Sequence, residues 1–544
     1  MGALAGLLVL IAGGIWFYVS RTGSDSPTSR PLLSGDVLQR ACDLPAPYLE
    51  RIYRGSHPAW SEEIVIVPRE PNFVGSFDLT SHSGPWPYLQ RIPLVFYGPG
   101  YIEAQGEVET PATMADVYPT VGRLLDVDLE EREGRVLEEA LISSDDLLPK
   151  LIVTVVWDGA GRATLERWGD RWPNLKRIVE GGTSYAKATV GSSPSVTSAV
   201  HSTLATGAYP RSHGVTGNEL RNENGDLIGT FAGSSPDDLE LTTSADQVDQ
   251  LLNNKPKVGM LAWNRWHLGM LGHGNTIRGA DDDEMALIHF KYGLRVNGAD
   301  AFAQVESLEH AADLDEEIAA LDREDGAMDE QWLGNDIALP ASKAPWDLYS
   351  NPAWARVHAK LAVEMLRKGR YGQDSVPDLW MTNLKMTDLA GHRWGLESQE
   401  TAAVLEAQDE ALGTMLEYLD EEVGDYVVVL TADHGTAPLA TDTGAWPILQ
   451  DELIKDVNEH FDVPDSDPLI ESSAAAAYFI DPDVAEDSNV SLENISAFLN
   501  DYTIEQNWTS EELPEGYGGR GEEQVFSAVF PTEELDAIRD CASG

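Results

Sequence analysis

Short apolar runs that alternate with helical segments constrain the fold of this chain most. Six such runs are rich in β-branched residues and bounded by turn residues, at 64–67, 92–97, 151–157, 258–262, 379–384 and 426–430. Segments with helical periodicity, such as 401–419, lie between them. This alternation predicts an α/β fold with a mostly parallel central sheet sandwiched by helices. The acidic stretch 300–345 has few strand signals and is predicted to belong to a cap insertion over about 275–350.

Polar side chains directly follow three of these predicted strands. They are Asp158, Asp388, His392, Asp433 and His434. Each has an ordinary explanation when taken alone, such as an Asp-Gly turn or a pair on a helix surface. Because the carboxyl ends of parallel strands share one edge of a sheet, we expect these side chains to meet. Carboxylates mixed with imidazoles suit zinc, with manganese as the second choice. The set is too large for one tetrahedral ion and therefore predicts a two-metal site of the kind that catalyses phosphoryl transfer.

Four sequence motifs carry a resemblance to a known family. They are VVWDG at 155–159, SSPSVTSAVHSTLATGAYPRSHGVTGN at 192–218, DLAGHRWG at 388–395 and TADHG at 431–435. Together they resemble the alkaline phosphatase superfamily, and most closely its type I phosphodiesterase/nucleotide pyrophosphatase branch. The resemblance implies a mostly parallel sheet between helices, a cap near the site, and a metal-dependent phosphoric ester hydrolase that acts on a small phosphate ester.

The resemblance also implies roles for individual residues. Thr197, at the start of a predicted helix, matches the nucleophile and a ligand of the zinc that activates it. Asp158, Asp433 and His434 match the other ligands of that zinc. Asp388 and His392 match ligands of a second zinc. Asn218 matches the residue that contacts the phosphoryl oxygens.

The third ligand of the second zinc is a late histidine in relatives, and here the best match comes early. His460 lacks a glycine-rich context, whereas His82 lies in TSHSGPWPY at 80–88, which resembles the late family segment. We therefore assign His82 as this ligand and predict a circular permutation. Residues 46–148 then correspond to the usual C-terminal segment, and 150–541 carry the nucleophile and metal motifs. The permuted ends are expected to meet, which places Cys42 and Cys541 within bridging range, although two free thiols remain an alternative.

Two departures from the family concern the substrate. Some monoesterases of the superfamily carry Lys-x-Arg, where this chain has Trp263-Asn-Arg265. Arg265 is kept as a phosphate contact, and loss of the lysine disfavours a monoester dianion. Trp263 is expected to stack on a base or leaving group, with a core tryptophan as an equal alternative. Val200 replaces an asparagine that is common in the pyrophosphatases. A phosphomonoesterase, a phosphonate hydrolase and a non-catalytic cell-surface binding protein stay open as alternatives.

Composition and the N-terminus bear on partners and location. The chain of 544 residues has 91 Asp and Glu against 37 Lys and Arg, a net charge of −54, which excludes a general binder of nucleic acid duplexes. Such an acidic surface also suits a halophilic source. Residues 3–19 carry no charge and end in aromatic residues, so residues 1–20 are predicted to anchor the protein in a membrane. A tether at 21–45 would then lead to an extracytoplasmic catalytic domain at 46–544. The oligomeric state is left open.

Overall fold

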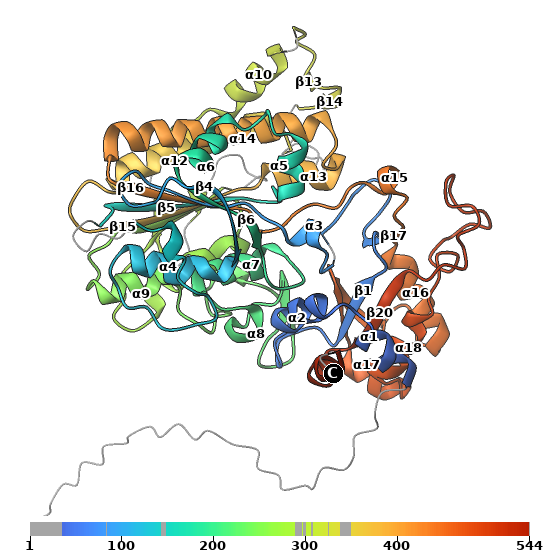
Figure 1. The fold of residues 1–544 in the computed structure, drawn as a ribbon. Helices are drawn as coiled ribbons and strands as arrows, with labels where there is room; N and C mark the ends of the chain where they lie inside the picture. Colours follow the sequence, from blue (N-terminus) through green and yellow to red (C-terminus); the bar gives the residue numbers. More distant parts are fainter. Residues whose placement is uncertain are drawn as a thin grey trace, which may run out of the picture.

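A computed structural model shows two lobes, a larger one around a ten-stranded sheet and a smaller one around a four-stranded sheet (Figure 1). The structure describes residues 35–82, 84–142, 148–288, 296–297, 301–305, 308–324, 326–337 and 350–542. The predicted membrane anchor at 1–20 lies outside these residues. Within them, none of the helices has the length and hydropathy that a membrane span requires.

The large sheet confirms the predicted mostly parallel α/β architecture. In spatial order its strands are β11 (Val296–Asn297), β10 (Glu284–Ile288), β9 (Val258–Ala262), β15 (Asp378–Leu384), β5 (Leu151–Trp157), β16 (Tyr426–Thr431), β3 (Leu94–Tyr97), β6 (Thr183–Thr189) and β4 (Gly106–Thr113), and β12 (Ala303–Gln304) pairs with β10. Only β3 and β11 run against the other strands. Four central strands, β9, β15, β5 and β16, are therefore parallel neighbours whose carboxyl ends share one edge of the sheet.

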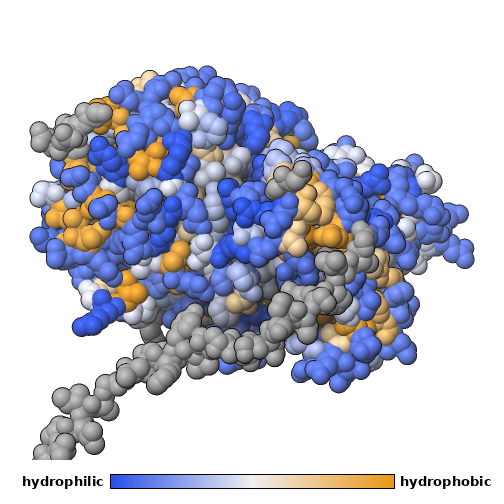
Figure 2. Space-filling view, turned by 60° about the horizontal axis from the view of Figure 1, so that its bottom comes forward, coloured by the Kyte–Doolittle hydropathy of each residue, from blue (hydrophilic) through white to orange (hydrophobic). Residues whose placement is uncertain are grey.

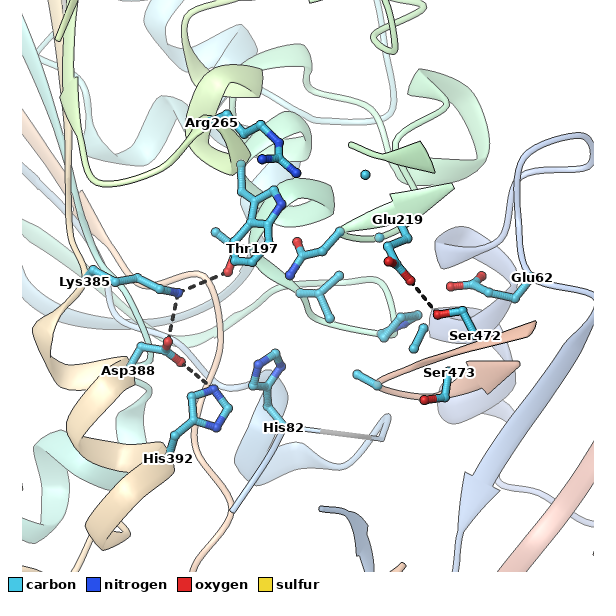
Figure 3. Close-up of a pocket in the computed structure, with 18 residues that line it drawn as sticks. Glu62, His82, Thr197, Glu219, Arg265, Lys385, Asp388, His392, Ser472 and Ser473 are labelled. Atoms are coloured by element: carbon cyan, nitrogen blue, oxygen red, sulfur yellow. Dashed lines mark hydrogen bonds and ion pairs between the residues drawn. The ribbon is translucent and has the colours of Figure 1, made fainter. Parts of the chain in front are cut away.

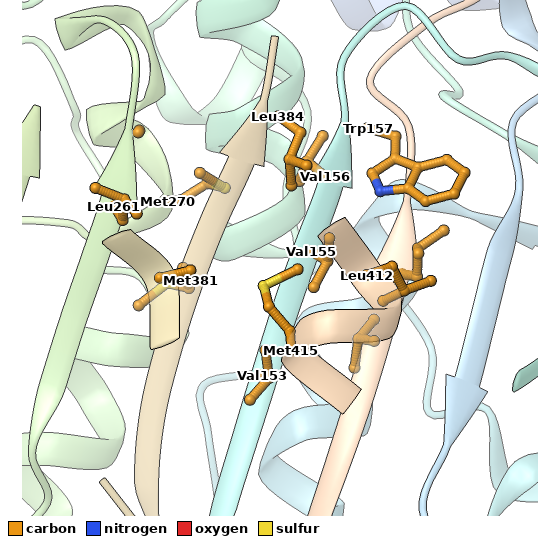
Figure 4. Close-up of a cluster of buried hydrophobic side chains, with 14 of the residues drawn as sticks. Val153, Val155, Val156, Trp157, Leu261, Met270, Met381, Leu384, Leu412 and Met415 are labelled. Carbon is orange, nitrogen blue, oxygen red and sulfur yellow. The ribbon is translucent and has the colours of Figure 1, made fainter. Parts of the chain in front are cut away.

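Helices cover both faces of this sheet (Figure 1). One face carries α5 (Arg162–Arg167), α6 (Pro173–Gly181), α12 (Pro352–Gly369), α13 (Met386–Trp394) and α14 (Gln399–Tyr418), and the other carries α4 (Val117–Leu124), α7 (Thr197–Thr206) and α9 (Ser244–Leu251). All seven residues of β5 are buried, as expected for a strand covered on both sides. Figure 4 shows Val153 and Val155 beside Leu412 and Met415 of α14 in this core.

The smaller lobe corrects the predicted position of one strand. The run 64–67 forms β1 (Ile64–Pro68), but β1 pairs antiparallel with β19 (Ala477–Ile480) and β20 (Phe526–Pro531) and does not join the central sheet. The fourth strand is β18 (Ile470–Ala474). The helices around this sheet are α1 (Gly35–Cys42), α2 (Ala46–Gly55), α16 (Gln450–Phe461), α17 (Pro482–Ser488), α18 (Leu492–Asn500) and α19 (Leu535–Ala542). A buried apolar run predicts a strand but does not identify its partner.

The two ends of the described chain meet in the smaller lobe. Cys42 at the end of α1 and Cys541 in α19 form a disulfide with a Cα–Cα distance of 5.8 Å. This confirms that the two cysteines lie within bridging range.

The predicted cap insertion at 275–350 is corrected in its first part, because β10, β11 and β12 belong to the large sheet. The described part from residue 308 onward lies on the outside of the larger lobe. It includes α10 (Leu314–Glu324), β13 (Gln331–Trp332) and β14 (Asn335–Asp336), and α10 packs against α12 (Figure 1). The molecular surface is mostly hydrophilic on the face shown in Figure 2, with apolar side chains in scattered spots, in keeping with the acidic composition.

Candidate active site

The first group of predicted ligands gathers where β5 and β16 end. Asp158 follows β5 directly, and Asp433 and His434 follow β16. The Nε2 atom of His434 lies 3.7 Å from Asp158 Oδ1 and 3.5 Å from Asp433 Oδ2. The backbone N–H of Gly159 donates to Asp433 Oδ1 at 3.0 Å and holds the two loops together. All three predicted ligands are buried, so the parallel register of the two strands brings them to one point.

The second group comes from α13 and from the loop before α3 (Pro87–Gln90). Asp388 and His392 are one helical turn apart, and His392 Nε2 lies 3.2 Å from Asp388 Oδ1. The ring of His82 stacks on the ring of His434 with centroids 3.7 Å apart, and its centroid is 5.4 Å from that of His392. Figure 3 shows His82 and His392 side by side below Asp388. The structure thus brings His82, from the N-terminal part of the chain, to the residues with which the sequence groups it.

Both groups have the chemistry that a transition-metal ion requires. Ligand-type atoms of Asp158, Asp433 and His434 lie within 4.8 Å of one another. A second cluster of the same size combines His82 and Asp388 of the second group with His434 of the first, and His392 lies beside it, 3.2 Å from Asp388. Among the predicted ligands, three buried atoms make no hydrogen bond within the described part of the chain: His82 Nδ1, His434 Nε2 and Asp433 Oδ2. Such orphaned, converging imidazole and carboxylate atoms fit a zinc-type ion.

Hydrogen bonds and burial keep these imidazoles ready to bind a cation. The Nδ1–H of His392 donates to the Thr80 carbonyl at 2.6 Å, and that of His434 donates to the Gly435 carbonyl at 3.1 Å, so the Nε2 atoms of both rings are left to face the site. Burial alone would lower the pKa of His392, but Asp388, whose Oδ1 lies 3.2 Å from His392 Nε2, raises it above its usual value. Burial lowers the pKa of His82 well below its usual value, and the neighbouring His434 and His392 add to the shift. His82 is therefore neutral, as a metal ligand must be.

A lysine that sequence reasoning missed lies between the two groups. Lys385 Nζ is 2.9 Å from Asp158 Oδ1, 2.8 Å from Asp388 Oδ2 and 3.3 Å from Thr197 Oγ1 (Figure 3). Burial alone would lower the pKa of Lys385, but the charges of Asp158 and Asp388 raise it above its usual value. The only sequence signal was a lysine directly after a predicted strand, which is ordinarily a surface residue.

One ammonium does not balance the three buried carboxylates. Burial opposes ionisation of Asp158, yet the adjacent Lys385 holds the pKa of that carboxyl below its usual range. Burial and then repulsion by Asp158 raise the pKa of Asp433 well above its usual range. Three carboxylates thus face one fixed cation, an arrangement that further positive charge would stabilise.

Thr197 opens helix α7 and points its hydroxyl at this centre. It is buried, with 3% of its surface exposed, and it lines the cavity described below. Its carbonyl accepts a 2.7 Å hydrogen bond from His201 Nδ1, and His201 Nε2 in turn accepts one from Asn383 at 3.0 Å. Burial lowers the pKa of His201 to about 3, so its ring is neutral. His201 and Asn383, which the sequence did not single out, position the first turn of the helix.

Two of the three predicted substrate contacts face the cavity. Asn218 Oδ1 accepts hydrogen bonds from the backbone N–H and the hydroxyl of Ser198, at 3.3 and 2.9 Å, which fixes the amide beside the nucleophile helix. Arg265 donates from Nε to the Thr230 carbonyl at 3.1 Å and also lines the cavity. Trp263 does not: it is 2% exposed and packs against Trp354, so the structure corrects the predicted stacking contact to a core position.

A cavity of about 540 Å³ joins the site to the smaller lobe. One end holds Thr197, Lys385, Asp388 and the two histidines His82 and His392, and the other is formed by Glu62, Glu219 and residues 472–475 of the β18–β19 hairpin (Figure 3). Among the described residues of 275–350, none lines this cavity. Within the described part of the chain, the smaller lobe therefore supplies the cavity wall opposite Thr197.

This fold and this set of residues define the class of the protein. A mostly parallel sheet whose strand ends collect a helix-terminal threonine, three aspartates and three histidines is an alkaline phosphatase-like hydrolase. The chain belongs to the type I phosphodiesterase/nucleotide pyrophosphatase family, whose model matches residues 152–522. It is therefore a phosphate-ester hydrolase of the phosphodiesterase and alkaline phosphatase class, from a group of enzymes that depend on metals.

Individual relatives are distant. The chain is 24% identical to the alkaline phosphatase PafA of Elizabethkingia meningoseptica over 397 residues, which is 64% of this chain and 72% of that protein. It is 31% identical to the alkaline phosphatase PhoD of Zymomonas mobilis over 109 residues, 19% of each chain. The crystal structure of PafA superposes with a TM-score of 0.51 at 19% identity, covering 72% of this chain and 85% of that one. This structural likeness supports the fold.

Proposed function

We propose that the protein is a phosphodiesterase of the nucleotide pyrophosphatase type that uses Thr197 as its nucleophile and holds two zinc ions. The observation that carries this proposal is the convergence of Thr197 Oγ1 with buried, unpartnered imidazole and carboxylate atoms at one edge of the sheet. Asp158, Asp433, His434 and Thr197 would hold one ion, and Asp388, His392 and His82 the other. Zinc at such a site lowers the pKa of a bound hydroxyl and neutralises charge on the phosphate.

The reaction runs through two displacements at phosphorus. Thr197 Oγ1 attacks, a Thr–O–P bond forms, the ester P–O bond breaks, and the alcohol leaves with a proton. Water then attacks the phosphothreonine, which restores the threonine hydroxyl and releases a phosphomonoester. Because α7 begins at Thr197, the amide dipoles of its first turn favour a negatively charged phosphoryl group there. The Asn218 amide and the Arg265 guanidinium would contact its oxygens.

Thr197→Ala tests the proposal. Hydrolysis of bis-p-nitrophenyl phosphate by the zinc-loaded variant should fall by about three orders of magnitude or more, because the covalent route is lost. Zinc content, measured by atomic emission, should stay close to that of the parent protein, since Thr197 supplies only one donor. Thr197→Ser is the matched control and should retain a large part of the activity. Near-normal turnover by Thr197→Ala would refute the assignment of the nucleophile.

A phosphomonoesterase is the second candidate, and Lys385 favours it. The sequence predicts diester preference because a lysine is missing at Trp263. Lys385 lies 3.3 Å from Thr197 Oγ1 and supplies a positive charge on another side of the same site. A monoester dianion carries one more negative charge than a diester, so it gains more from this cation. The ratio of kcat/KM for p-nitrophenyl phosphate and its bis ester decides between the two candidates.

We also propose that the catalytic domain works outside the cytoplasm. The Cys42–Cys541 disulfide supports this location, because disulfides persist mainly in oxidising compartments.

A further inference from the structure

The two ends of the cavity carry different charged groups. Its two permanently cationic side chains, Lys385 and Arg265, lie at the Thr197 end, where Lys385 is paired with Asp158 and Asp388. The opposite end presents the carboxylates of Glu62 and Glu219 and the hydroxyl groups of Ser472 and Ser473 (Figure 3). Among the described lining residues, none at that end is basic. A ligand that spans the cavity therefore meets cationic side chains only at the Thr197 end, and at the other end it meets carboxylates with no cationic partner in the described lining.

Glu62, at the acidic end of the cavity, has a buried carboxylate oxygen that no donor among the described residues satisfies. It precedes β1, is 5% exposed, and its Oε1 atom is buried without a hydrogen-bond partner in the described part of the chain. Figure 3 shows its carboxylate directed into the cavity. Its neighbour Glu63 differs, because it forms a salt bridge with Arg221 at 2.6 Å. A buried carboxylate with no compensating donor is costly, which makes a cationic ligand favourable here.

Small and acidic residues surround the Glu62 carboxylate. Gly217 lies beside it, and a Cβ atom at that position would stand 3.6 Å from Glu62 Oε1, so any longer side chain would cover the carboxylate. Glu219 stands across from it and accepts a 2.7 Å hydrogen bond from Ser472. Burial, followed by repulsion from Glu63 and Glu219, raises the pKa of Glu62 to about 7. The two carboxylates Glu63 and Glu219 thus favour a positive charge beside Glu62.

We propose that this end of the cavity binds a positively charged organic group, and that the substrate is a phosphate ester of an amino alcohol. The inference rests on the proposed function, since it names the substrate class of the same site. The phosphoryl group would lie at Thr197 while the ammonium group lies between Glu62 and Glu219. An ester whose second alcohol carries a carboxylate would be repelled by the same two carboxylates.

Three matched p-nitrophenyl phosphodiesters test this proposal. The second alcohol is choline, its neutral carbon isostere 3,3-dimethylbutanol, or the anionic 4-hydroxybutyrate, and p-nitrophenolate release reports all three. At about pH 8, where Glu62 is mostly ionised, kcat/KM should rank choline above the isostere by about tenfold and the anionic ester last. Glu62→Gln and Glu219→Gln should each shrink the choline-to-isostere ratio, and the double variant should bring it near one.

Glu471→Gln is the control for long-range charge. Glu471 is in β18, next to Ser472, but it pairs with Arg221 at 3.1 Å and does not line the cavity. Glu471→Gln removes one negative charge, as Glu62→Gln does, and should leave the choline-to-isostere ratio of kcat/KM unchanged. A choline-to-isostere ratio near one in the parent enzyme, with all esters hydrolysed, overturns the subsite and leaves the proposed function intact.

Direct binding measurements test the cationic subsite even if the protein hydrolyses none of the esters. If the zinc-loaded protein hydrolyses none of the esters, the proposed function fails. Calorimetric titration with phosphocholine and with 3,3-dimethylbutyl phosphate then decides the subsite, because a tighter phosphocholine complex that weakens in Glu62→Gln supports it. Equal affinities would overturn it. Thermal unfolding of each variant checks that folding is retained.

Discussion

Single residues at the strand ends were predictable by type, but their neighbours were not. Asp158, Asp388 and Asp433 were predictable as site residues. Each follows a buried strand, and the carboxyl ends of parallel strands bring such carboxylates to one edge of the sheet. Lys385 gives no such signal, since its contacts with two of these carboxylates depend on a fold that a linear sequence does not display. Trp263 shows the converse, because nothing in its sequence context distinguishes a ring packed in the core from one facing a ligand.

Lys385→Met tests whether the ammonium group serves the substrate. Removing a positive charge 3.3 Å from the nucleophile should lower kcat/KM for p-nitrophenyl phosphate about tenfold more than for bis-p-nitrophenyl phosphate, because the dianion loses more attraction. Steady-state kinetics with both substrates on zinc-loaded protein measures this difference. Lys257→Met, which removes a lysine paired with Asp374 and Asp378 on the surface, is the control. Equal losses on the two substrates would assign Lys385 to the fold alone.

His82→Ala tests the ligand that comes from the N-terminal segment. Loss of one of three protein donors should lower the zinc stoichiometry from about two towards one and impair hydrolysis. Metal analysis after dialysis against dilute zinc measures this directly. His460→Ala is the matched control, because His460 is exposed on α16 and stacks on Phe498, with ring centroids 4.3 Å apart. Unchanged zinc content in His82→Ala would remove it from the ligand set.

At the scale of elements, strands were predictable but their partners were not. The runs 151–157 and 258–262 coincide with β5 and β9, because apolar β-branched residues bounded by turns suit a strand covered on both faces. The run 64–67 has the same character, yet β1 joins a separate antiparallel sheet. The pairing is decided by β19 and β20, more than 400 residues further along the chain, whose own sequence signals are weak. The β18–β19 hairpin that closes the cavity was missed for the same reason.

Gly207→Ala tests how the nucleophile helix is terminated. Gly207 follows α7 at φ +67°, and an added Cβ would lie 2.6 Å from the Tyr118 ring. The left-handed conformation costs about 1–2 kcal/mol for a non-glycine residue, and overpacking adds a similar amount, so the free energy of unfolding should fall by about 2–4 kcal/mol. Gly225→Ala is the control, because its φ is +86° but no atom lies within 4 Å of the added Cβ. Denaturant unfolding of both variants separates the steric effect from the backbone effect.

At the scale of the whole molecule, the circular permutation of the chain stays a prediction. The contacts between α2 and α19 and the Cys42–Cys541 bond place both ends of the described chain in one lobe, as a permuted protein requires. The matched part of the family begins at residue 152, just after the predicted boundary.

A rearranged chain tests this prediction. Residues 143–541 joined through a Gly-Ser linker to residues 35–142 should fold, because α1 packs against α19 and the Cα atoms of Cys42 and Cys541 are only 5.8 Å apart. Its far-ultraviolet circular dichroism and its kcat/KM for bis-p-nitrophenyl phosphate should stay within a few-fold of residues 35–541 in their natural order. Persistent aggregation or loss of the fold would show that the break after Ile142 interrupts an essential connection.

The bond between Cys42 and Cys541 also decides how the molecule bears mechanical load. The catalytic fold lies inside a covalent ring, and both chain ends leave that ring at neighbouring points. Tension applied between the two ends passes through two sulfur atoms and bypasses the hydrogen bonds of both sheets. A pull on the two chain ends would therefore leave the strand ends, and with them the candidate active site, without mechanical load.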